Sequence, residues 1–204
     1  MNGLFIVIDG VDGAGKSTQA LRIVDYYKNR GAVVQHLREP GGTRYGEAIR
    51  TILLSNEYPR GTAAEVLGFF AARAQLLEER ILPSLERGEI VICERWVSST
   101  YAYQSAAFLF DSKFVENLET LVVRRNPDLL IILDLPVADS LARIRGELDG
   151  IERRGKDYFE RVRAGFHGYA ARRGFVKLVN GAGTENEVFD RILPFLKNGT
   201  NPVS

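Results

Sequence analysis

Short apolar runs alternate with longer amphipathic stretches along this chain. The runs are rich in valine, isoleucine and leucine, which is typical of strands that are buried on both faces. They predict five strands, at residues 4–9, 32–37, 89–93, 128–133 and 175–179.

Between the predicted strands, apolar residues recur at the spacing of an α-helix. Ile23 and Tyr27, for example, fall on one face of such a helix. The spacing predicts helices at residues 16–30, 47–54, 63–85, 113–125, 137–145, 156–172 and 185–196. Pro83 should bend the third helix or start a new turn. Thr184 and Glu187 form a capping box before the last helix.

The alternation of strands with helices predicts an α/β fold. The expected architecture is a single domain with a five-stranded parallel sheet and helices on both faces. Ligands of such sheets bind at the carboxyl ends of the strands. Asp9, Arg38, Glu94 and Asp134 fall at or just past predicted strand ends. We therefore expect the functional site at this edge of the sheet.

Composition places the chain among folded proteins and narrows its partners. Of 204 residues, 45% are hydrophobic and 26% are charged, and the net charge is +1. This balance argues against a dedicated nucleic-acid binder, and no apolar run is long enough to span a membrane. A single cysteine, Cys93, excludes an intramolecular disulfide and fits a reducing, cytoplasmic location. We expect one domain over residues 1–197 and a flexible tail at 198–204.

A glycine-rich segment lies between the first predicted strand and the first predicted helix. Residues 10–17 match the pattern G-x-x-x-x-G-K-[ST], in which backbone N–H groups bind phosphate oxygens. Lys16 can reach the β- and γ-phosphates, and Ser17 can bind Mg²⁺. The pattern predicts a P-loop NTPase fold, but does not distinguish a kinase from a hydrolase or a nucleotide switch. The expected nucleotide-binding residues are Gly10, Val11, Asp12, Gly13, Ala14, Gly15, Lys16, Ser17 and Thr18.

Three further segments carry chemistry suited to a second phosphate-bearing ligand. Residues 38–43, Arg-Glu-Pro-Gly-Gly-Thr, predict an irregular loop after the second strand. Phe69 and Arg73 are four residues apart, so a helix presents an aromatic plane beside a guanidinium, which suits a nucleobase. Arg95 follows the third strand, where it can bind an acceptor phosphate. Taken singly, each has an ordinary structural explanation, such as a core phenylalanine or a solvated arginine.

In combination, these segments resemble the bacterial thymidylate kinase family over nearly the whole chain. The resemblance is carried by residues 8–18, 38–43, 72–75, 94–96, 99–104 and 127–129, and by a lid-like segment at 143–152. It is much more specific than the P-loop alone. It implies an enzyme that transfers the γ-phosphoryl group of ATP to dTMP with Mg²⁺, yields dTDP and ADP, and works as a homodimer.

The resemblance also implies roles for individual residues. It places Phe69 on the thymine ring, Arg73 on a base carbonyl and Tyr103 beneath the deoxyribose. It gives Arg95 the acceptor phosphate and puts Asp9 beside the reacting phosphates. The expected catalytic residues are Asp9, Lys16, Arg95, Arg143 and Arg145. The expected substrate-binding residues are Arg38, Phe69, Arg73, Arg95, Ser99, Thr100, Tyr103, Asp149 and Glu152, and the expected metal ligands are Ser17 and Glu94.

Two positions depart from the family pattern. Glu94 stands where the family usually has aspartate, and we expect it to orient Arg95 or a metal-bound water. In the lid, at about residues 143–155, Gly150 replaces a usual arginine. The acidic Asp12 goes with the family type whose catalytic cation comes from the lid. That cation must then be Arg143, Arg145, Arg153 or Arg154.

Two other functions stay open from the sequence. One is a kinase with the same P-loop that acts on dCMP, dUMP or a nucleoside. The other is a nucleotide switch, which would recruit a protein partner and would not turn over an acceptor. A GTP-dependent switch should carry an N-K-x-D motif, and the sequence has none.

Overall fold

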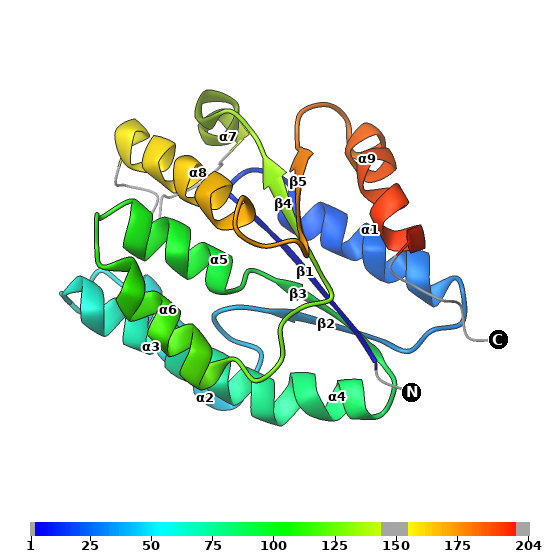
Figure 1. The fold of residues 1–204 in the computed structure, drawn as a ribbon, viewed down its shortest axis with the longest axis horizontal. Coiled ribbons are helices and arrows are strands. Elements are labelled where there is room, and N and C mark those ends of the chain that lie inside the picture. The colour runs from blue at the N-terminus through cyan, green and yellow to red at the C-terminus, as the bar shows by residue number, and fades with distance from the viewer. Residues whose placement is uncertain (1–2, 144–154, 199–204) are drawn as a thin grey trace.

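The computed structural model describes residues 3–143 and 155–198, which form one five-stranded parallel sheet with its helices (Figure 1). The strands are β1 (Leu4–Gly10), β2 (Val34–Arg38), β3 (Ile90–Glu94), β4 (Leu129–Asp134) and β5 (Val176–Asn180). Their order across the sheet is β2-β3-β1-β4-β5, with β1 in the middle. The α/β fold with five parallel strands is confirmed.

The register of the strands gathers charged side chains at one edge of the sheet. Ile8 of β1 pairs with Glu94 of β3, and Glu94 also pairs with Arg38 of β2. Asp9 of β1 pairs with Ile132 of β4. The strand ends that carry charge are therefore neighbours in space, as the parallel arrangement requires.

Helices cover both faces of the sheet. They are α1 (Lys16–Lys28), α2 (Arg44–Leu54), α3 (Thr62–Leu76), α4 (Leu82–Glu86), α5 (Val97–Thr100), α6 (Ser112–Val122), α7 (Val137–Arg143), α8 (Lys156–Ala170) and α9 (Glu185–Asn198), with π-helical segments η1 (Leu77–Ile81) and η2 (Tyr101–Ala106). Figure 1 shows α1 and α9 together on one side of the sheet and α5 and α8 on the other. Within the described ranges, no helix has both the length and the apolar character needed to cross a membrane.

Three predicted helices differ clearly from the structure in extent. The helix expected at 47–54 begins earlier, at Arg44, because the Thr43 side chain caps it there. The helix expected at 63–85 is divided, because α3 passes into the π-helical segment η1 before α4 begins. Pro83 is the second residue of α4, and its missing N–H cannot continue the preceding hydrogen-bond ladder. The helix expected at 113–125 ends at Val122, because Val123 has an extended backbone.

The helical segment at 97–106, where α5 continues into η2, was not predicted from the sequence. Most of this segment is buried, so it has no polar face to reveal a helical period.

The capping box before α9 is confirmed. Thr184 N–H donates to Glu187 Oε2 at 2.7 Å, and Glu187 N–H donates to Thr184 Oγ1 at 3.3 Å.

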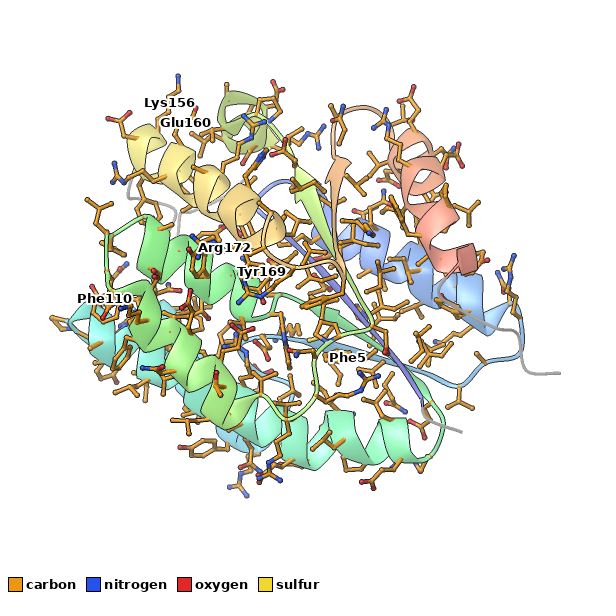
Figure 2. The ribbon with its side chains drawn as sticks, viewed as in Figure 1. Phe5, Phe110, Lys156, Glu160, Tyr169 and Arg172 are labelled. Atoms are coloured by element: carbon orange, nitrogen blue, oxygen red, sulfur yellow. The ribbon has the colours of Figure 1, made fainter. Side chains whose placement is uncertain are left out.

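An aromatic contact joins the middle strand to the segment that follows β3. Phe5 of β1, which Figure 2 labels within the sheet, and Trp96 are both fully buried. Their rings meet edge to face, with centroids 5.1 Å apart and planes at 84°. Such a pair contributes about 0.5–1.5 kcal/mol beyond the burial of the two rings. The contact holds Trp96, the residue after Arg95, against β1.

Candidate active site

The turn after β1 leads directly into α1 and is held by α7. Gly13 and Gly15 have positive φ angles of 76° and 92°, which other residues rarely adopt. A side chain at Gly13 would also lie 2.4 Å from the carbonyl oxygen of Ser140 in α7. The Ser140 hydroxyl donates to the carbonyl oxygen of Asp12 at 2.5 Å. The sequence therefore builds a tight turn at a helix N-terminus, which is the arrangement that binds phosphate.

The ammonium group of Lys16 lies over this turn. Its Nζ donates to the carbonyl oxygens of Gly10 at 3.1 Å and Val11 at 2.9 Å. Burial and the nearby charge of Arg95 together lower the pKa of Lys16 to about 8, although the charge of Asp12 opposes them. A bound polyphosphate would favour the charged form, because it brings negative charge to a buried cation.

A cavity of about 450 Å³ opens beside the turn. Its lining residues are Asp12, Gly13, Gly15, Lys16, Ser17, Thr18, Arg38, Glu39, Arg50, Glu94, Arg95 and Arg143. Of the nine expected nucleotide-binding residues, Gly10, Val11 and Ala14 lie behind this lining and are buried. Lys16 and four arginines outnumber the three carboxylates of this lining, so the cavity has a net positive charge, which suits a polyphosphate. We call it the donor cavity.

Ser17 and Glu94 lie in contact on the donor cavity. The Ser17 hydroxyl donates to Glu94 Oε2 at 2.5 Å, and Glu94 Oε1 lies 2.9 Å from Nε2 of His36. Hydrogen bonds from His36 and Ser17 keep the pKa of Glu94 below its ordinary value although burial raises it. No group of three or more His, Cys, Asp or Glu side chains suited to a metal occurs in the described part of the chain. A hydroxyl and a carboxylate oxygen side by side do fit Mg²⁺, which commonly takes few protein ligands and completes its shell with water and phosphate.

A second cavity, of about 250 Å³, lies on the other side of Asp12 and Arg95. It brings together six of the expected substrate residues: Phe69, Arg73, Arg95, Ser99, Thr100 and Tyr103. Phe69 and Arg73 share one face of α3, as their spacing predicted, and both line this cavity. The other lining residues are Asp12, Glu39, Pro40, Arg50, Leu54, Trp96 and Gln104. We call it the acceptor cavity.

Asp12, Arg95 and Tyr103 meet at the boundary of the two cavities. The Arg95 guanidinium pairs with the Asp12 carboxylate, and the Tyr103 hydroxyl donates to Asp12 Oδ2 at 2.7 Å. Burial alone would raise the pKa of Asp12, but the charges of Arg95 and Lys16 lower it to about 2. The carboxylate that pairs with Arg95 is therefore Asp12. Of the two roles expected for Glu94, orienting Arg95 or a metal-bound water, the structure leaves the second, because Glu94 bonds to Ser17 and His36.

The backbone of Arg95 is unusual for a residue with a side chain. Its φ angle is 69°, in the left-handed region that favours glycine. The Arg95 N–H donates to the carbonyl oxygen of Ile8 at 2.9 Å, which holds the residue against β1. Such strain persists where the surrounding structure imposes it, often at functional sites.

Asp9 is fully buried and lines neither cavity. Its carboxylate accepts hydrogen bonds from the hydroxyls of Ser98 at 2.5 Å and Ser99 at 2.7 Å, and from the Trp96 N–H at 3.3 Å. Ser98 and Ser99 thus bind Asp9 and do not cap α5 by their side chains. Asp9 connects the end of β1 to the wall of the acceptor cavity.

The remaining expected residues lie at the rim of the donor cavity or outside the described ranges. The side chain of Arg38 is largely exposed and lies 3.4 Å from Glu47. Arg143, at the end of α7, donates to the carbonyl oxygen of Gly181 at 3.3 Å. The expected lid residues Arg145, Asp149 and Glu152, with Gly150, Arg153 and Arg154, lie outside the described residues.

Asp134, at the end of β4, belongs to a separate cluster. Arg163 of α8 donates to its two carboxylate oxygens at 2.7 and 2.8 Å, and His167 Nε2 lies 2.9 Å from Oδ1. The hydrogen bond from Arg163, helped by His167, lowers the pKa of Asp134 to about 2. The cluster joins α8 to the sheet.

Several residues at these sites were not assigned from the sequence. His36 and His167 each contact a carboxylate at a strand end. Glu39 and Gln104 line the acceptor cavity. Both stand in runs that carry the resemblance, at 38–43 and 99–104, and those runs were the available signal. Arg50, in the helix that follows the 38–43 loop, lines both cavities.

Comparisons with known proteins agree with this geometry. A family model described as Thymidylate kinase matches residues 8–192. A thymidylate kinase from Alcanivorax borkumensis is 44% identical over 168 residues, which are 80% of each chain. One from Carboxydothermus hydrogenoformans is 38% identical over 200 residues, 97% of this chain and 98% of its own. A crystal structure of thymidylate kinase from Ehrlichia chaffeensis superposes with a TM-score of 0.80 at 28% identity, covering 97% of this chain and 99% of the other. The chain belongs to the thymidylate kinase family.

Proposed function

We propose that the two cavities hold ATP and dTMP end to end, and that the enzyme transfers the γ-phosphoryl group of ATP to dTMP to give ADP and dTDP. The observation that carries this proposal is the shared wall: Asp12 and Arg95 line both the donor and the acceptor cavity. A phosphate bound at Arg95 therefore lies next to the turn that binds the polyphosphate. A hydrolase or a nucleotide switch has no use for such a second cavity.

The donor side is formed by the turn after β1 and the start of α1. Backbone N–H groups and the positive end of the α1 dipole would bind the β- and γ-phosphates. Lys16 would leave the carbonyl oxygens of Gly10 and Val11 for a phosphate oxygen. Arg143, the first residue of the expected lid, lines the same cavity.

Ser17 and Glu94 would hold Mg²⁺ on this side, directly or through a water. When bound, the ion neutralises charge that develops on the transferring phosphoryl group. Glu94 is kept in place by His36, so its carboxylate is oriented without any ligand.

The acceptor side is formed by α3, α5 and η2. Phe69 would stack on the base, and Arg73 and Thr100 would face its polar edge. Tyr103 is buried beneath the cavity and would support the deoxyribose. Arg95 would bind the acceptor phosphate, with Arg38 as a second contact from the donor side.

Catalysis then rests on positioning and charge. The acceptor phosphate is already a nucleophile at neutral pH, so no strong general base is needed. Its oxygen forms the new bond to the γ-phosphorus while the bond from that phosphorus to the β,γ-bridging oxygen breaks. Lys16 and Arg95 stabilise charge on the transferred group from the two sides. Closure of a lid at 143–155 would exclude water and limit hydrolysis of ATP.

We also propose a cytoplasmic homodimer. Tyr45 and Ile52 of α2 and Leu67 of α3 are each about half exposed, on two helices that pack together, and a partner subunit would cover them. Cys93 is buried and free, which fits a reducing compartment. Light scattering of the wild type and of Ile52→Glu tests the dimer, which should dissociate in the variant.

The function is tested by a coupled assay of ADP release with a panel of acceptors: dTMP, dUMP, dCMP and thymidine. We expect the highest kcat/KM with dTMP. A nucleotide switch would show slow turnover that no acceptor stimulates. In the same assay, Arg73→Ala should raise the KM for dTMP and loosen the choice of base. If it leaves kcat and KM unchanged, the role given to Arg73 is wrong.

A further inference from the structure

A buried ion pair lies at the acceptor cavity, and one of its two members, Glu39, has no role in the phosphoryl transfer described above. It joins Glu39, which directly follows β2, to Arg73 of α3. Glu39 is 4% exposed and Arg73 is 1% exposed, yet both line the cavity. The Glu39 N–H donates to the carbonyl oxygen of Glu94 at 2.9 Å, so the backbone of Glu39 is held against β3.

The pair leaves one end of the Arg73 guanidinium available. Glu39 Oε2 accepts from Arg73 Nε at 2.8 Å and lies 2.5 Å from Nη2. Nη2 also donates to Thr100 Oγ1 at 3.3 Å. Nη1 is buried and has no hydrogen-bond partner among the described residues. A buried donor of this kind carries a desolvation penalty until a ligand satisfies it.

Aromatic rings fix the plane of the same guanidinium. Its central carbon lies 4.8 Å from the ring centre of Phe70 and 5.4 Å from that of Trp96. With Glu39 on one edge and rings beside its face, Arg73 has little freedom to turn. The direction of Nη1 is therefore set before any ligand binds.

The charge of Arg73 is balanced within the protein. An unpaired buried guanidinium would attract an anion, and the acceptor carries one in its phosphate. Burial raises the pKa of Glu39 to about 7 although the Arg73 guanidinium lowers it, so the carboxylate depends on that partner for its charge. Paired in this way, Arg73 can serve as a hydrogen-bond donor to an uncharged carbonyl.

We propose that Glu39 is a specificity-determining positioning residue: it neutralises and orients Arg73 so that Nη1 selects an acceptor base with a carbonyl at the facing edge. The inference rests on the proposed function, because it assumes that a nucleobase occupies the acceptor cavity. It predicts discrimination against a base with an amino group at that edge, since two donors would then face each other. Glu39 itself acts through Arg73 and need not touch the substrate.

The test is a double-mutant cycle of Glu39→Gln and Arg73→Gln, measured by steady-state kinetics. Glu39→Gln should raise the acceptor KM by about tenfold and change kcat by less than about twofold, since binding is lost but phosphate chemistry is not. The preference for dTMP over dCMP should fall in the same variant. Because Glu39 acts through Arg73, the double variant should be no worse than Arg73→Gln alone.

Controls separate this role from a general effect on folding. Glu89→Gln removes the same charge from a carboxylate that pairs with Arg87 at the opposite end of β3, and should leave the acceptor KM unchanged. Thermal melting reports whether each variant is folded. If Glu39→Gln does not fold, Glu39→Asp replaces it in the cycle; it keeps the charge, shortens the reach to Arg73, and should show a smaller rise in KM.

The double-mutant cycle uses the monophosphate that the wild type phosphorylates fastest. The proposal that dTMP is the acceptor and the proposal that Glu39 positions Arg73 can then be rejected separately. A preferred acceptor other than dTMP that also has a carbonyl at that edge, such as dUMP, overturns the proposed function only, whereas a preference for dCMP overturns both proposals. Full additivity of the two substitutions, or an acceptor KM for Glu39→Gln equal to that of Glu89→Gln, overturns the role of Glu39. If no monophosphate is phosphorylated, both proposals are wrong.

Discussion

Asp12 and Tyr103 exchange two hydrogen bonds across the boundary of the cavities. The Tyr103 hydroxyl donates to the Asp12 carboxylate at 2.7 Å and accepts from the Asp12 backbone N–H at 3.1 Å. One residue belongs to the turn after β1 and the other to η2. The turn expected to bind ATP is thus bonded to the wall expected to bind the acceptor.

Tyr103→Phe should weaken acceptor binding and leave the fold intact. The change removes both hydrogen bonds and keeps the ring, which packs edge to face on Phe166 at 6.0 Å. Loss of the hydroxyl should lower stability by about 1 kcal/mol and raise the KM for dTMP by about fivefold. Kinetics with each substrate varied in turn measure this, and exposed Tyr58→Phe is the control. A rise in the KM for ATP alone would contradict the expectation.

Lys16→Ala should lower kcat by about a hundredfold or more, since it removes a positive charge that stabilises the transferring phosphoryl group. The matched control is Lys28→Ala, at the exposed end of the same helix, which should keep full activity. Single-turnover measurements separate the chemical step from product release. Equal rates for the two variants would remove Lys16 from the mechanism.

Asp134→Asn should destabilise the protein at neutral pH and not at acid pH. The folded pKa of Asp134, about 2, lies below its ordinary value of 3.8. Its contribution is therefore complete above the ordinary pKa and is lost as pH falls toward 2. The partly exposed group should contribute about 1 kcal/mol after solvent screening.

Urea denaturation of the wild type and of Asp134→Asn, at a series of pH values from 7 to 3, measures this dependence. The difference between the two should shrink below about pH 4. Exposed Asp190→Asn should show no such difference at any pH. A difference that stays constant with pH would mean that the charge of Asp134 is not its cause.

Phe5→Leu should lower the free energy of unfolding by about 1–2 kcal/mol, because it removes the edge-to-face contact with Trp96 and leaves a small void. Phe108→Leu makes the same chemical change at a position that is 43% exposed and should have a much smaller effect. Thermal or urea unfolding compares the two. Equal losses would mean that the contact with Trp96 adds nothing beyond the ring's own burial.

The sequence predicted the parts of this protein that depend on local pattern. The five apolar runs became the five strands because their β-branched and aliphatic residues favour buried strands. β1, β3 and β4 are almost wholly buried, and the edge strands β2 and β5 are partly exposed. The turn after β1 was predicted because glycines at Gly13 and Gly15 are a local requirement of its backbone. The residues of the acceptor cavity were predicted only through the resemblance to a family, which depends on several motifs in combination.

The contacts between those parts could not be predicted in the same way. Asp12 meets Tyr103, 91 positions away, only because η2 packs beside the turn. The register of β2 and β3 places Arg38 opposite Glu94. His36 is two residues before Arg38 on β2, so its side chain lies on the same face of the sheet and reaches Glu94. Glu39 pairs with Arg73 only because the residue that follows β2 lies beside one face of α3. Such partners are set by packing over long sequence separations.

The Asp9 carboxylate accepts hydrogen bonds from Ser98, Ser99 and the backbone of Trp96. These bonds make the region beneath the acceptor cavity rigid. Motion of β1 relative to α5 would break three hydrogen bonds to a buried charge at once. Any change of shape that accompanies substrate capture should therefore occur at the rim, where Arg38 lies 3.4 Å from Glu47 and Arg143 donates to the carbonyl oxygen of Gly181 at 3.3 Å. Changes in specificity that arise by mutation should also come more readily from the rim than from beneath it.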